Sequence, residues 1–132
     1  MKLVATESLM GTALDWAVAK CEKLNVIEDP MGFKKDAPEC SQAGFWVWDE
    51  TPPCTMQLIG INGQYSPSTN WSQAGPIIEK HNIAIAPIPY WTSWVSGDHQ
   101  HRGQTALISA MKAYVASVLG EEIEVPENIL YE

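Results

Sequence analysis

Apolar residues recur at steps of three and four in two long stretches of the chain, the spacing that places side chains on one face of an α-helix. In residues 7–25 the recurring positions are Leu9, Ala13, Ala17, Cys21 and Leu24. The polar side of the same pattern consists of Asp15, Lys20, Glu22 and Lys23. We therefore predict an amphipathic helix here, with Asp15 on its polar side and Cys21 as a small core residue.

The stretch 105–120 shows the clearest helix pattern in the chain. Thr105 suits the N-cap position, and Gly120 suits the C′ position after the helix end. The apolar face consists of Leu107, Ile108, Met111, Val115, Val118 and Leu119. The cap, the periodicity and the terminating glycine all indicate the same helix.

A third helix is predicted after Asn70, where a polar segment gives way to an apolar edge. Asn70 or Ser72 can cap its start. Pro76 is expected within the first turn, because a proline is tolerated only near a helix start. Ile77 and Ile78 then supply the edge that faces the core.

The strand patterns are short and lie between these helices. Segments that are alternating, β-branched or apolar are residues 2–6, 45–50, 56–63, 83–86 and 121–130. Residues 45–65 are expected to form a small antiparallel sheet. Pro87 and Pro89 end the strand 83–86, and we expect residues 87–104 to be a long loop of the kind that is often functional.

Together these elements predict a single domain over residues 1–132 of the α+β class, with about three helices packed on a small, mostly antiparallel sheet. A chain of this length buries about two-thirds of the surface that its unfolded form exposes. No apolar run approaches the roughly 18 residues of a membrane-spanning helix, and the start of the chain lacks the pattern of a signal peptide. We therefore expect a cytoplasmic protein with no membrane partner.

The net charge of −8 limits the partners of this chain. Its eight basic residues are scattered along the sequence, so general binding to DNA or RNA is disfavoured. One small anionic ligand remains compatible with this charge, because such a ligand needs only one or two basic groups and some backbone N–H donors.

Residue types that carry catalysis or bind metals form no recognisable motif. The sequence contains no Cys-x-x-Cys, phosphate loop, dinucleotide fingerprint or Gly-x-Ser-x-Gly elbow. We therefore expect no catalytic residues and no cofactor, and a binding protein is favoured over an enzyme. His99 and His101 could share a metal ion, since alternate residues of an extended strand point the same way, but that site would need further ligands from elsewhere.

Six tryptophans in a chain of this size are its compositional anomaly. Some of them, such as Trp16, are explained as core residues whose indole N–H reaches water. Tyr90, Trp91 and Trp94 are candidates for stacking on a planar group, an interaction worth about 1–3 kcal/mol per nucleobase. Arg102 is the only arginine and could pair with a phosphate, although an ordinary surface position is the alternative.

Two polar helix starts could converge on one ligand. At one start, Gly103 permits a close backbone approach, and Thr105 precedes a first turn whose free N–H groups can bind an anion. Simple capping explains Thr105 equally well. One wall of the expected pocket consists of Tyr65, Ser66, Ser68, Thr69 and Trp71, and the other of Trp91, Trp94 and Arg102, next to Gly103 and Thr105.

Three segments resemble the NinX-like family of small phage accessory proteins. They are "GTALDWAVAKCE", "YSPSTNWSQAGPIIEKHNI" and "TALISAMKAYVASVLGEEIEVPE", which occur in this order at both ends and in the middle of the chain. Asn70 stands where the family pattern has an aspartate, and Ala106 where it has a proline. The loss of the aspartate weakens any acidic or metal-binding role for position 70.

The resemblance implies a phage gene product that acts in the bacterial cytoplasm, while it leaves the biochemical role open. Because some small phage proteins sequester nucleotide-derived defence signals, the leading hypothesis is a non-enzymatic pocket for a small nucleotide-like ligand, in a homo-oligomer. A protein that inhibits a host factor through its aromatic surface is the first alternative. A hydrolase acting on the same class of ligand is the second.

Overall fold

The computed structural model describes residues 1–60 and 63–130. In chain order, the elements are β1 (Lys2–Ala5), η1 (Thr6–Ser8), α1 (Gly11–Cys21), β2 (Val26–Glu28), α2 (Phe33–Asp36), β3 (Phe45–Trp48), β4 (Met56–Leu58), α3 (Trp71–His81), β5 (Ala84–Ala86), β6 (Trp91–Trp94), β7 (His101–Gly103), α4 (Ala106–Leu119), β8 (Glu122–Val125) and η2 (Glu127–Ile129). Residues 61 and 62, which fall in the predicted strand 56–63, lie outside the described part.

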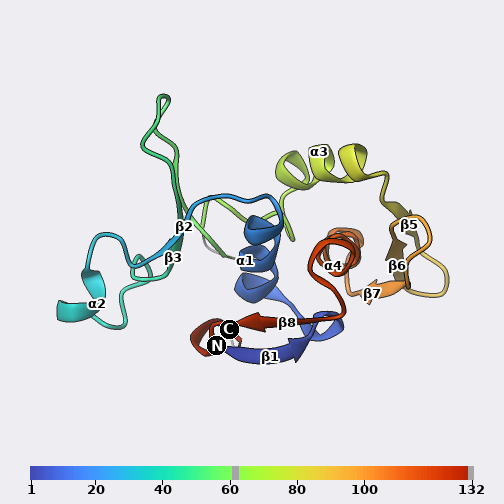
Figure 1. Cartoon of the computed structure of the whole chain (residues 1–132), viewed down its shortest axis with the longest axis horizontal. Helices are drawn as coiled ribbons and strands as arrows, with labels where there is room; N and C mark the ends of the chain where they lie inside the picture. Colours follow the sequence, from blue (N-terminus) through green and yellow to red (C-terminus); the bar gives the residue numbers. More distant parts are fainter. Residues whose placement is uncertain (61–62, 131–132) are drawn as a thin grey trace.

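Two helices, α1 and α4, pack against each other at the centre of the molecule (Figure 1). Nine of the eleven residues of α1 are buried, so this helix has little of the polar face that its sequence suggested. The fully buried side chains from the two helices include Leu14, Val18, Met111, Tyr114 and Val115. This helix pair forms the middle of the hydrophobic core.

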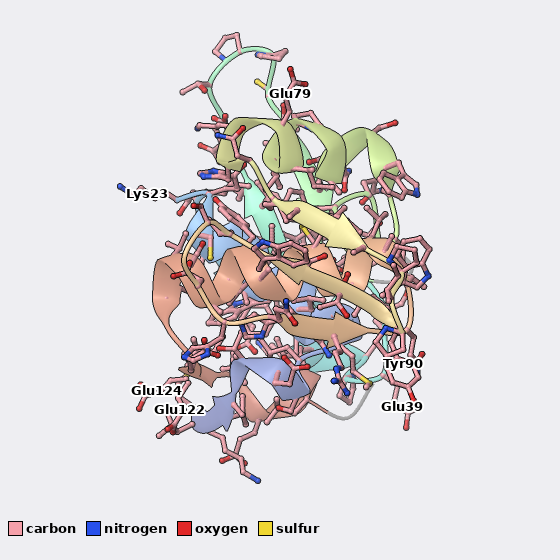
Figure 2. All side chains as sticks on the ribbon, turned by 90° about the vertical axis from the view of Figure 1, so that its right-hand side faces the viewer. Lys23, Glu39, Glu79, Tyr90, Glu122 and Glu124 are labelled. Atoms are coloured by element: carbon pink, nitrogen blue, oxygen red, sulfur yellow. The ribbon has the colours of Figure 1, made fainter. Side chains whose placement is uncertain are left out.

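Three small sheets surround the helix pair. The strand orders are β1–β8, β2–β3–β4 and β5–β6–β7, and every pair of neighbouring strands is antiparallel. The β5–β6–β7 sheet packs on α4, as Figure 2 shows from the sheet side. The predicted α+β class with three long helices is confirmed, and its strands are divided among three sheets instead of forming one.

The prediction that residues 87–104 form one long loop is wrong, because this segment contains strands β6 and β7. In β6, Trp94 pairs with Ala84 of β5, and Trp91 pairs with Gly103 of β7. The two middle residues, Thr92 and Ser93, are buried, but their hydroxyls bond to the Tyr90 carbonyl and the Ser109 hydroxyl. These buried hydroxyls replace the apolar alternation that normally reveals a strand.

Both predicted helix caps of the later helices are present. The Asn70 side chain accepts a hydrogen bond from Ser72 N–H, and the Thr105 hydroxyl accepts one from Ile108 N–H. Pro76 lies beyond the first turn of α3, inside the helix, which corrects the expected position. Pro76 is exposed, so water can solvate the carbonyl that its missing N–H leaves without a helical partner.

The first and last strands bring the two ends of the chain together. Val4 of β1 pairs with Ile123 of β8, and the Thr6 hydroxyl donates to the Gly120 carbonyl at 2.6 Å. Figure 1 shows this two-stranded ribbon below α1, with the N-terminus at its side. In the described part of the chain, no helix combines the length and the apolar character needed to cross a bilayer.

Two glycine-to-alanine changes should have opposite effects on stability. A Cβ at Gly103 would lie 2.5 Å from the Ser109 nitrogen on α4, whereas a Cβ at Gly75 on α3 would meet no atom within 4 Å. We expect Gly103→Ala to lower the free energy of unfolding by about 1–3 kcal/mol, and Gly75→Ala to raise it by up to about 1 kcal/mol. Urea unfolding measures both, and an unchanged midpoint for Gly103→Ala would contradict the close contact.

Candidate functional site

An open depression lies where the β5–β6–β7 sheet meets the start of α4. Its volume is about 330 Å³, and its lining residues are Pro87, Pro89, Tyr90, Trp91, Gly103 and Gln104. The structure therefore brings together Trp91 and Gly103 with Tyr90, which the sequence also indicated as a stacking candidate. We call Tyr90, Trp91 and Arg102 the aromatic–arginine platform.

The platform is exposed to solvent. Tyr90 is 61% and Trp91 39% exposed, and Tyr90 stands at the edge of the sheet in Figure 2. The Arg102 guanidinium lies over the Tyr90 ring at 5.5 Å from its centroid, which is a cation–π contact. Trp94, at the other end of β6, is only half-buried and pairs with β5.

The backbone beneath Arg102 is held on both sides. Its N–H donates to Glu7 Oε1 at 3.0 Å, and its carbonyl accepts a bond from Lys112 Nζ at 2.9 Å. Burial lowers the pKa of Lys112, while the nearby Glu7 carboxylate opposes that change. Gly103, the next residue, packs directly on α4. Gly103 is thus required for close contact with the helix, and this contact fixes the strand that carries the platform.

The other predicted wall is largely buried. Tyr65, Ser66 and Ser68 are each less than 10% exposed. Ser66 N–H donates to Gln73 Oε1 at 2.7 Å, and Ser68 N–H donates to Asp15 Oδ1 at 2.9 Å. The backbone of this segment, residues 65–70, is therefore bound to α1 and α3, and we call it the serine turn.

Thr69 and Trp71 are the members of this wall that solvent reaches. The Thr69 hydroxyl lies 3.3 Å from the Ser66 carbonyl, and Trp71 begins α3 with 58% of its surface exposed. Within the described residues, no hydrogen bond joins the two predicted walls.

Asp15 lies in the core, contrary to the prediction from its helical pattern. Its side chain is fully buried in α1, although the helical pattern put it on the polar side. Burial raises the pKa of Asp15 to about 6, while the hydrogen bond from Ser68 N–H opposes this rise. Its Oδ2 atom has no partner among the described residues, nor do the buried hydroxyls of Ser68 and Tyr65. The one sequence signal for a buried Asp15 is that this acidic residue lies within a run of apolar residues.

The two candidate metal-binding histidines have different environments. His101 is buried, and its Nδ1 lies 2.7 Å from Glu7 Oε2 while its Nε2 lies 3.4 Å from Glu121 Oε1. His99 is exposed. In residues 1–60 and 63–130, no three histidine, cysteine, aspartate or glutamate side chains are grouped so that they could hold a metal ion. His101 joins β7 to η1 and to the residue before β8.

The comparisons with known proteins agree with the resemblance noted in three segments. The profile of a family described as "Bacteriophage P22, NinX" matches residues 5–118. The match includes α1, the serine turn, α3 and the platform. A comparison with curated proteins gave no match.

Replacing Asp15 should change how stability depends on pH. The folded-state pKa of Asp15 is about 6, above its ordinary value of 3.8, so its contribution to stability is complete below pH 3.8 and is lost as pH rises through 6. This loss corresponds to about 3 kcal/mol. We expect Asp15→Asn to be more stable than the parent at pH 8 by up to about that amount, with the difference disappearing near pH 4.

Asp49 provides the matched control, because Thr51 N–H and its hydroxyl donate to the Asp49 carboxylate and lower its pKa. Asp49→Asn should therefore lose stability at neutral pH. Thermal unfolding of the three proteins between pH 4 and pH 8 measures both effects. A destabilised Asp15→Asn with the same deficit at every pH would show that the Ser68 bond outweighs the burial of the charge.

Proposed function

Because the chain belongs to the NinX family of bacteriophage P22, we propose that it is a phage accessory protein that binds a small nucleotide-like ligand and sequesters it unchanged in the host cytoplasm. The observation that carries this proposal is the aromatic–arginine platform beside the start of α4. Tyr90 and Trp91 are both exposed and line the depression together, and the chain's only arginine, Arg102, contacts the Tyr90 ring. Such rings stack on a nucleobase, and a guanidinium binds a phosphate through two parallel hydrogen bonds.

The location of the platform supports an anionic ligand. Arg102 is three residues before Thr105, whose hydroxyl caps α4 through Ile108 N–H. The remaining first-turn N–H groups carry the positive end of the helix dipole and favour a phosphate near them. Gln104, which also lines the depression, adds an amide that can both donate and accept a bond from a base.

The chemistry around the depression favours holding a ligand over converting it. Its lining consists of aromatic, proline, glycine and glutamine residues, which suit stacking and hydrogen bonding. In this proposal Arg102 neutralises ligand charge. Exposed Thr69 and Trp71 remain candidates for additional contacts, while the buried serines support the turn that carries them.

We include a homo-oligomer in this proposal. The depression is open, so one chain covers only one face of a planar ligand, and a second copy could cover the other. The exposed apolar loop next to the platform, in which Ile88 is 79% exposed, gives a second copy a surface to contact. The same loop also supports the alternative of a host protein partner, because exposed apolar residues gather at protein interfaces.

Saturating ligand should raise the melting temperature of the full chain. The probes are AMP, ADP-ribose and a cyclic dinucleotide, each tested separately by thermal unfolding. At a concentration one hundred times its Kd, a bound probe stabilises the folded state by about 2.7 kcal/mol, which corresponds to a rise of about 10 °C for a chain of this size. Arg102→Ala and Trp91→Ala should each reduce that rise.

Lys34→Gln is the control for charge, because Lys34 is exposed on α2 and its loss changes the net charge by the same amount as Arg102→Ala. This variant should keep the full temperature rise. A failure of all three probes would refute the nucleotide-like ligand. Recovery of a hydrolysed probe after long incubation would instead support the enzyme alternative, and a host protein captured from lysate without any probe effect would support the inhibitor alternative.

A further inference from the structure

A large hollow lies away from the platform, against the β2–β3–β4 sheet. It has a volume of about 950 Å³ and is lined from three segments, namely Lys23–Asn25 with Ile27, Val47–Thr51, and Thr55 with Gln57. Figure 1 shows the β3–β4 connection, residues 49–55, projecting from the body of the molecule beside this sheet. We call this hollow the arm groove, since the projecting connection forms one side of it.

Two carboxylates of the arm groove are held in place by hydrogen bonds. Asp49 Oδ1 accepts bonds from both the backbone N–H and the hydroxyl of Thr51. These bonds lower the pKa of Asp49, so the side chain is ionised at neutral pH. Glu50 Oε1 accepts the indole N–H of Trp48 at 3.0 Å. Both groups have thus lost side-chain freedom before any ligand arrives, which reduces the entropy cost of binding.

Trp48 adds an aromatic surface beside these carboxylates. It is half-buried, and its ring forms a T-shaped contact with the Trp46 ring at a centroid distance of 6.1 Å. The cation–π pairs among the described residues are Lys20 with Trp16 and Arg102 with Tyr90, so they do not include Trp48. An ionised carboxylate next to an aromatic ring is a combination that binds a lysine or arginine side chain.

We propose that the arm groove binds an extended basic peptide segment of another protein, with a lysine or arginine side chain placed between Asp49, Glu50 and Trp48. The apolar lining residues Leu24, Ile27 and Val47 would contact the rest of the segment. Lys23, the one base in the lining, opposes the cation and therefore provides a test of the electrostatic argument. This proposal is independent of the nucleotide-like ligand, because the two surfaces share no lining residue.

The probe is the capped peptide Gly-Arg-Gly-Arg-Gly, titrated into the full chain by calorimetry at low salt. We expect saturable binding with one peptide per chain. The double variant Asp49→Asn with Glu50→Gln should weaken it about tenfold or more, because each bond to a charged group is worth about a tenfold change or more in affinity. Lys23→Gln should tighten it. Quenching of tryptophan fluorescence, lost in Trp48→Leu, would place the peptide on this ring.

Glu122→Gln with Glu124→Gln is the matched control, since it removes the same two charges from β8. Figure 1 places β8 on the other side of α1 from the projecting connection. If this control weakens the peptide as much as the groove variant does, general attraction to an acidic protein explains the binding and the proposal is overturned. Absence of saturable binding also overturns it, as does equal affinity for spermidine, which carries the charges without the peptide.

Discussion

The contact between α1 and α4 is the one on which the remaining structure depends. Each sheet has only two or three strands, and so few strands are marginal in water unless a hydrophobic surface supports them. The β5–β6–β7 sheet has that support from α4, and the β1–β8 ribbon lies below the same helix pair (Figure 1). The aromatic–arginine platform lies on this supported sheet, so packing on α4 holds its backbone although its side chains are exposed.

Asp15 places a second constraint on the same helix pair. A buried carboxylate without a positive partner is costly, and its bond with Ser68 N–H offsets only part of that cost. What the carboxylate supplies is an acceptor inside an otherwise apolar helix, where the serine turn needs one for a buried backbone N–H. The serine turn in turn positions Asn70, the cap of α3. One polar contact in the core therefore links α1 to the start of α3.

Local patterns were sufficient to predict the three long helices, because caps such as Thr105 act over only a few residues. Local patterns were insufficient wherever a residue distant in the sequence determines whether a side chain is buried or a strand forms. The strand Trp91–Trp94 was missed because its buried Ser93 is satisfied by Ser109, sixteen residues away. Gly103 was predicted to permit the close approach of a ligand, and in the structure the group packed closely against it is α4. The burial of one predicted wall of the site was missed for the same reason. Its Ser68 contacts Asp15, which is distant in the sequence, and only the fold shows this contact.

The electrostatics of the whole chain explain why its two proposed surfaces should differ. A net charge of −8 repels a long polyanion, yet a small anion that reaches Arg102 meets a guanidinium, an aromatic ring and a helix start within one short segment. The same net charge attracts cations over several ångströms, within the screening length of about 8 Å at physiological salt. At the arm groove, carboxylates that hydrogen bonds hold in place would give an attracted cation one specific binding position. Under the two proposals, the acidic composition would therefore limit the size of an anionic ligand on one face and set the charge of a partner on the other.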